Sequence, residues 1–61
     1  MPEVIIYALE GRTPETKLAL AKDITEAVTK HLGVPAENVM VQIVESSRDS
    51  KFRGGAPFSQ K

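Results

Sequence analysis

Two apolar runs in this chain predict β-strands. The first, Val4–Leu9, is continuous and rich in β-branched residues, which is typical of a strand buried on both faces. The second, Val39–Val44, is largely apolar as well and follows a short turn over 35–38. Because a long helical pattern separates the two runs, we expect parallel strands joined by a right-handed crossover.

Between these runs the apolar residues take helical spacing and predict one amphipathic helix, Pro14–Leu32. The residues of its apolar arc are Leu20, Ala21, Ile24, Ala27, Val28 and Leu32, and those of its polar arc are Lys22, Asp23, Glu26 and Lys30. Thr13 is expected to cap the start of the helix, and Gly33 to end it in the left-handed conformation.

The predicted sheet has more apolar surface than its own helix can cover. One helix covers only one face of a two-stranded sheet, and the other face of these strands is also apolar. A chain of 61 residues buries only about 60% of its unfolded surface, and this one has no cysteine for a disulfide. We therefore expect a single domain over residues 1–61, an α/β (α+β) βαβ subunit that must meet another subunit.

Residues 46–61 differ from the rest of the chain. They are polar, contain Gly54-Gly55, and have only Phe52 and Phe58 as large apolar side chains. The glycine pair predicts a tight turn and a small C-terminal hairpin, with a flexible tail as the alternative. The basic residues of this segment, set against Asp49 alone, are Arg48, Lys51, Arg53 and Lys61. They either help to hold an anionic small molecule or form a solvated surface.

Composition changes this picture little. Eight basic and eight acidic residues cancel, so the net charge does not indicate a nucleic-acid or membrane partner. The apolar segments are too short to cross a bilayer, and we recognise no signal peptide. The expected location is the cytoplasm.

Few side chains offer acid–base or nucleophilic chemistry. Cysteine is absent, which excludes a Cys–His pair and a thiolate metal site, and we recognise no Ser–His arrangement around His31, the only histidine. His31 is expected to be a capping or partly buried structural residue in the last helical turn. The remaining candidate base is Pro2. If Met1 is removed, Pro2 carries a free secondary amine, and desolvation and nearby cations favour its neutral, basic form.

The chain resembles the tautomerase superfamily, specifically the small 4-oxalocrotonate tautomerase (2-hydroxymuconate tautomerase) group. The residues that carry the resemblance are Pro2, Leu9-Glu10-Gly11-Arg12-Thr13 with Glu15 and Lys17, a second strand ending at Glu45, and Gly54-Gly55. The resemblance covers nearly the whole chain. It implies the tautomerase fold, a dimer with a four-stranded sheet, and a homohexamer of three dimers. No cofactor and no metal are implied.

The resemblance also implies a reaction, of the kind found in aromatic degradation. Pro2 would be the base that moves a proton within an enol or dienol 2-oxo acid. Arg12, from a neighbouring subunit, would bind a carboxylate of this small-molecule substrate and help to keep the proline amine neutral.

Two positions depart from the family pattern. Met40 stands in the second strand where the family's main member has a second arginine, and methionine cannot donate a hydrogen bond. Lys51 stands at the aligned position of an aromatic residue near the proline, so that Phe52 takes this place only if the loop is shortened. Arg48 or Arg53 are candidates to supply the missing charge.

Three hypotheses remain. The leading one is a tautomerase of 2-hydroxymuconate-like or phenylpyruvate-like enols, with Pro2 as base and Arg12 as anion binder. The second is a weakly active or inactive assembly subunit of a hetero-oligomer, whose partner replaces the arginine missing at Met40. The third is dehalogenation by hydration, which would need a water-activating carboxylate such as Glu45 or Asp49.

Overall fold

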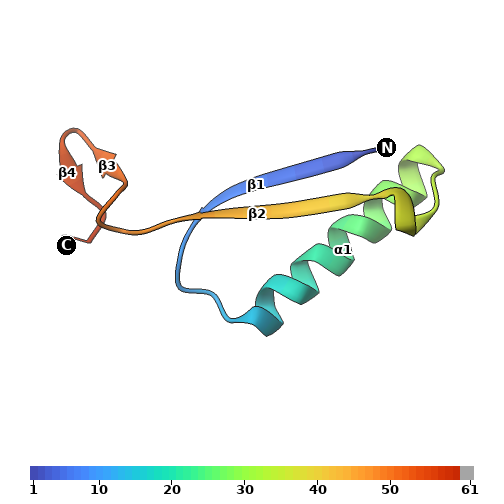
Figure 1. Ribbon diagram of the computed structural model, residues 1–61, viewed down its shortest axis with the longest axis horizontal. Coiled ribbons are helices and arrows are strands. Elements are labelled where there is room, and N and C mark those ends of the chain that lie inside the picture. Colours follow the sequence, from blue (N-terminus) through green and yellow to red (C-terminus); the bar gives the residue numbers. More distant parts are fainter. Residues whose placement is uncertain (60–61) are drawn as a thin grey trace.

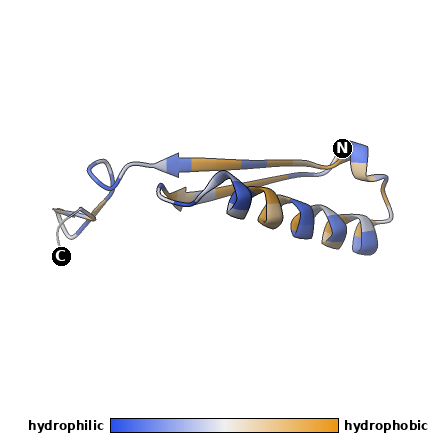
Figure 2. Cartoon of the chain, turned by 90° about the horizontal axis from the view of Figure 1, so that it is seen from below, coloured by the Kyte–Doolittle hydropathy of each residue, from blue (hydrophilic) through white to orange (hydrophobic). Residues whose placement is uncertain are grey.

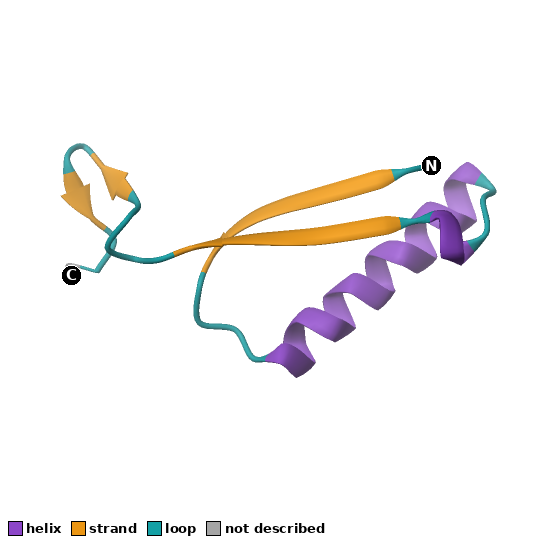
Figure 3. Cartoon of the chain, in the orientation of Figure 1, coloured by secondary structure: helices purple, strands orange, loops and turns teal. Residues whose placement is uncertain are grey.

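The chain folds into a βαβ unit followed by a small hairpin. The computed structural model describes residues 1–59. Its elements are β1 (Glu3–Leu9), α1 (Pro14–Leu32), a 3₁₀ helix η1 (Ala36–Asn38), β2 (Met40–Ser46), β3 (Phe52–Arg53) and β4 (Ala56–Pro57). The strands β1 and β2 lie side by side, and α1 lies on one side of the pair (Figures 1 and 3). Within residues 1–59, no helix combines the length and apolar character needed to cross a membrane.

The two long strands are parallel, as the sequence predicts. Their register runs from Glu3 opposite Met40 to Leu9 opposite Ser46. The second strand starts one residue later and ends two residues later than the predicted Val39–Val44. Its apolar pattern stops at Val44, but the ladder continues, because the Glu10 N–H donates to the Ser46 carbonyl at 2.9 Å.

The helix has the predicted bounds, and local signals set both ends. Thr13 is extended, and its Oγ1 accepts a hydrogen bond from the Thr16 N–H at 3.1 Å. Pro14 occupies the first turn, where its missing N–H leaves no bond unmade. Gly33 takes the left-handed conformation, φ 68° and ψ 33°, and its N–H donates to the Thr29 carbonyl. These caps satisfy backbone groups that the helix itself cannot pair.

Only one face of the sheet is covered. Alternate strand residues such as Ile6 and Ile43 are half-buried on the side of α1, which packs mainly against β2. On the other face the exposed fractions of Ile5, Tyr7 and Met40 are 47%, 74% and 49%. The prediction of a strand buried on both faces is therefore wrong for the single chain, because one helix can shield only one side.

The single chain has no core of its own. None of residues 1–59 is buried, and Leu20 and Leu32 are exposed although they lie on the predicted apolar arc. The radius of gyration is 14.7 Å. A compact chain of this length would have about 10 Å. An extended shape with half-exposed apolar residues is typical of a subunit that completes its packing against other chains.

The predicted hairpin is confirmed. β3 and β4 pair antiparallel, and the two residues between them, Gly54 and Gly55, have φ of 60° and 84°. Positive φ at both central positions is the type I′ pattern, which favours glycine. The hairpin lies beyond the carboxyl end of β2, at the opposite end of the molecule from the N-terminus (Figures 1 and 2). Of the predicted basic tail residues, Lys61 lies outside the described residues.

Candidate active site

Pro2 lies at the amino end of the parallel sheet. Its carbonyl oxygen accepts a hydrogen bond of 3.0 Å from the Met40 N–H, so the start of β1 is tied to the start of β2. Pro2 is half-buried, whereas Met1 before it is 87% exposed. Removal of Met1 would therefore leave a secondary amine on a backbone that the sheet already holds in place.

Met40 is the nearest strand neighbour of this site. It pairs with Glu3 in the register, and its side chain is exposed on the same uncovered face as Ile5 and Tyr7. The structure thus brings Pro2 together with Met40, the position of the missing arginine. This surface next to the candidate base also has the polar side chains of Glu3 and Gln42, and the strands contribute no cation to it.

Arg12 lies at the other end of the sheet. It follows the Glu10-Gly11 turn after β1, and its Nη1 donates to the Leu9 carbonyl at 2.9 Å. β1 runs from Glu3 to Leu9. At a rise of about 3.3 Å per residue, a strand of this length separates Pro2 from Arg12 by roughly 20 Å. The two residues of one chain are therefore too far apart to hold one small substrate together.

Arg48 shares the end of the sheet that carries Arg12. Gly11 has φ of 123°, and a Cβ placed on it would lie 4.0 Å from Nη2 of Arg48. Sequence reasoning proposed Arg48 only as one of two replacements for a lost charge and did not place it beside Arg12. The strand register explains why Arg48 lies near Gly11. Leu9 pairs with Ser46, and Gly11 and Arg48 each follow two residues after this pair.

An ion pair links α1 to β2 close to these arginines. Lys17 Nζ and Glu45 Oε1 are 3.0 Å apart, with side chains 33% and 29% exposed. The pair borders an apolar pocket of about 240 Å³ between helix and sheet, which is also lined by Ile6, Ala8, Arg12, Thr16, Leu20 and Ile43. Because Glu45 is engaged by Lys17, it is a poor candidate for the water-activating carboxylate of the hydration hypothesis. Asp49 is exposed in the turn after β2.

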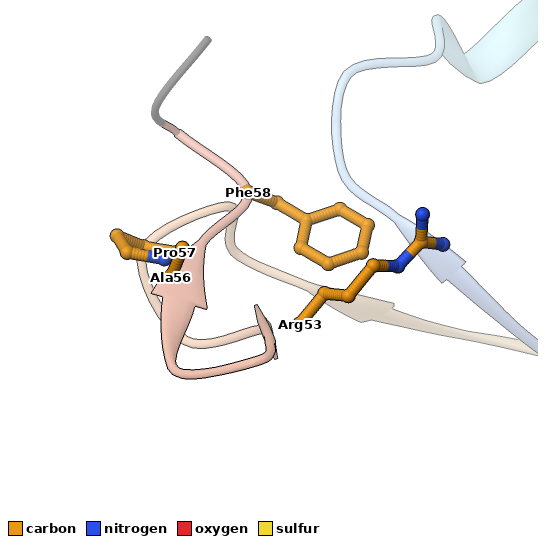
Figure 4. Close-up of a pocket in the computed structure, with 4 residues that line it drawn as sticks. All are labelled: Arg53, Ala56, Pro57 and Phe58. Atoms are coloured by element: carbon orange, nitrogen blue, oxygen red, sulfur yellow. The ribbon is translucent and has the colours of Figure 1, made fainter.

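The hairpin gathers the other predicted residues. The guanidinium carbon of Arg53 lies 5.4 Å from the centre of the Phe58 ring (Figure 4). Lys51 Nζ lies 5.8 Å from the same ring centre. Both distances are typical of cation–π contacts. Phe52 is 58% exposed. Neither Phe52 nor Arg53 reaches Pro2 of the same chain, because the hairpin and the N-terminus lie at opposite ends of the molecule.

His31 is exposed in the last turn of α1. Of the two expectations, a capping residue or a partly buried one, the second is therefore wrong. The helix surface around His31 has no covering element in the single chain. Among residues 1–59, no three histidine, cysteine or carboxylate side chains are grouped closely enough to hold a metal ion.

Comparisons with known proteins indicate one family. A family model described as "Tautomerase enzyme" matches residues 2–61. A "Probable tautomerase" from Bacillus cereus is 46% identical over 61 residues, which is 100% of both chains. A 2-hydroxymuconate tautomerase from Pseudomonas putida is 38% identical over 60 residues, which is 98% of this chain and 95% of that protein.

Solved structures give the same result. The crystal structure of a 4-oxalocrotonate tautomerase homologue superposes with a TM-score of 0.92 at 41% identity, covering 100% of this chain and 97% of that one. A heterohexamer 4-oxalocrotonate tautomerase from Chloroflexus aurantiacus superposes with a TM-score of 0.86 at 30% identity, covering 98% and 97%.

Proposed function

Because this chain belongs to the tautomerase family, we propose that it isomerises an enol or dienol 2-oxo acid with the amine of Pro2 as base, once Met1 has been removed. The observation that carries the proposal is the position of Pro2. Its carbonyl is tied to Met40 at 3.0 Å and its nitrogen lies at the open amino edge of the sheet. Neither β1 nor β2, the strands that meet at this edge, contains a histidine or cysteine that could be an alternative base.

The reaction needs no group besides the substrate and the protein. The neutral amine accepts the enol O–H proton, the carbonyl forms as the electron pair moves through the double bond, and the same proton is returned to a carbon of the substrate. Arg12 binds a substrate carboxylate with charge-assisted hydrogen bonds, and its positive charge disfavours protonation of the amine. Phe52 is proposed to line the site from the hairpin.

The site is proposed to form between copies of the chain. The separation of roughly 20 Å along β1 requires that Pro2 and Arg12 of one site come from different copies. The exposed face with Ile5 and Tyr7 supports such an assembly, since no element of the chain covers it. We propose a homo-oligomer, with a hexamer of three dimers as the expected form.

The proposal is tested by enol-to-keto conversion, followed by ultraviolet absorbance, on purified protein whose intact mass shows that Met1 is gone. Pro2→Ala and Arg12→Ala should each lower kcat/KM by at least about 100-fold, because each removes a group that acts in the transition state. Lys30→Ala, on the exposed side of α1, is the control and should retain full activity. Undiminished activity of the Pro2 variant would eliminate the proposed mechanism.

The alternative is a weakly active or inactive subunit of a hetero-oligomer. Met40 favours it, since this position offers no donor to polarise a carbonyl, and one of the similar structures is described as a heterohexamer. Native mass spectrometry of the purified chain, with and without a co-expressed second subunit, distinguishes the two. A fully active assembly of this chain alone would rule out the alternative.

A further inference from the structure

The arginines of the chain are unequally placed. Its only three are Arg12, Arg48 and Arg53. Arg12 Nη1 is held at 2.9 Å by the Leu9 carbonyl, and Arg48 Nη2 lies 4.0 Å from the Cβ position of Gly11, the residue before Arg12. The Arg48 guanidinium therefore lies against the loop after β1 that carries Arg12. Arg53 is instead engaged with the ring of Phe58 in its own hairpin (Figure 4).

This pair lacks a counterion within the described residues. The one ion pair among residues 1–59 joins Lys17 to Glu45, and Glu10, in the same turn as Gly11, contacts neither arginine as an ion pair. Two neighbouring cations repel each other, and a carboxylate that accepts hydrogen bonds from both relieves this repulsion. The turn after β1 is thus suited to one anionic group held by two guanidinium groups.

The opposite end of the sheet has the opposite character. The uncovered strand residues next to Pro2 are Glu3, Ile5 and Met40. The carboxylate of Glu3 is the only charged group among these three. A second substrate carboxylate placed there would lose water without gaining a donor and would approach Glu3. An alkyl or aryl group would instead bury apolar surface against Met40.

We infer that Arg48 binds the same substrate carboxylate as Arg12, and that Met40 receives an apolar substrate end. Because Arg48, in the turn after β2, lies against the loop that carries Arg12, both enter the site of a neighbouring copy together. The substrate class is then the enol of a 2-oxo monocarboxylic acid with an alkyl or aryl side chain. This inference rests on the proposed function and adds to it a second binding residue and the charge of the substrate.

The role of Arg48 is tested with phenylenolpyruvate as the monocarboxylate probe. Arg48→Met should raise KM about tenfold or more and change kcat less, since a charge-assisted hydrogen bond to the bound carboxylate is lost. Arg48→Lys should recover part of the affinity, because the charge remains. Lys22→Met, which removes the same charge from the exposed face of α1, is the matched control. An unchanged KM in Arg48→Met, or the same loss in Arg53→Met instead, would overturn the assignment.

The charge of the substrate is tested by comparing phenylenolpyruvate with the dicarboxylate 2-hydroxymuconate. The unmodified protein should favour the monocarboxylate in kcat/KM by about tenfold, and Met40→Arg should shift the ratio towards the dicarboxylate by a similar factor. A tenfold preference of the unmodified protein for the dicarboxylate, or a ratio that Met40→Arg leaves unchanged, would contradict the inference.

Binding without turnover separates this inference from the proposed function. Calorimetric titration of the Pro2→Ala protein with phenylacetate should show binding that Arg48→Met weakens about tenfold. If binding depends on Arg48 but the unmodified protein shows no turnover, the proposed reaction fails and the anion site stands. If turnover depends on Pro2 but binding does not depend on Arg48, the inference fails and the reaction stands.

Discussion

The two ends of the β1–β2 sheet have different chemistry. The amino end has the candidate base at Pro2 beside the apolar side chain of Met40, while the carboxyl end has Arg12 and Arg48 around Gly11. In the proposed reaction, neither end alone can bind and convert an acidic enol. Since about 20 Å of strand lies between them, one chain cannot close the proposed site by itself. The uncovered sheet face and the lack of a core agree with a site that forms between copies of the chain.

A complementation experiment tests most directly whether the two ends of the sheet act together from different copies of the chain. Pro2→Ala and Arg12→Ala proteins should each be nearly inactive. After the two are unfolded and refolded together at equal concentration, about a quarter of the sites should combine an intact Pro2 from one copy with an intact Arg12 from another. Activity should therefore return to about a quarter of the unmodified level.

A mixture that stays as inactive as its components would show that both residues must come from the same copy. Separate refolding of each variant, followed by mixing without unfolding, is the control and should restore nothing while subunit exchange is slow.

The uncovered face is the next target. Tyr7→Glu introduces a charge into a surface that is 74% exposed in the single chain, and that should be buried in the assembly. Because an unpaired buried charge is costly and the single chain has no core, we expect loss of the oligomer together with loss of helical structure. Sedimentation velocity and circular dichroism measure the two effects. Tyr7→Phe keeps the apolar surface and should assemble normally; a folded, monomeric Tyr7→Glu protein would contradict the coupling.

The loop after β1, which holds Arg12, allows a test of how its conformation affects substrate binding. Gly11 has φ of 123°, so Gly11→Ala should cost about 1–3 kcal/mol of backbone strain. It should also raise KM, because the strained turn holds Arg12 and lies against Arg48. Gly33→Ala is the matched control, since Gly33 also has positive φ but lies at the far end of α1. Thermal unfolding should show destabilisation in both variants, and kinetics should show the rise in KM in Gly11→Ala only.

The sequence predicts the local features of this fold well. The bounds of α1 follow from Thr13-Pro14 and Gly33, whose conformational preferences act within one or two residues. The hairpin follows in the same way from Gly54-Gly55. The end of β2 was misplaced because Glu45 and Ser46 break the apolar pattern, although the backbone ladder continues through them.

Features that depend on contacts between distant segments were harder to predict. Arg48 approaches Gly11 only through the strand register, which hydrophobic spacing does not specify to the residue. Leu20 and Leu32 belong to the apolar arc that the spacing predicts, yet they are exposed because the described part of the chain does not cover them. The resemblance to a family singles out Pro2 and Met40 separately, but the hydrogen bond that joins them depends on the strand register.

The smallest expected effect concerns the Lys17–Glu45 pair, which borders the pocket beside Arg12. Both side chains are about a third exposed and 3.0 Å apart, so solvent and salt screen their attraction. Lys17→Met should lower the free energy of unfolding by less than about 1 kcal/mol, and the loss should shrink further in 1 M salt. Glu45→Gln should do the same, and the double variant should lose less than the sum of the two, because the pair is already broken by either change. Chemical denaturation at low and high salt measures all three. If the losses simply add, the two side chains do not interact in solution, and the charged end of the sheet is then defined by its arginines alone.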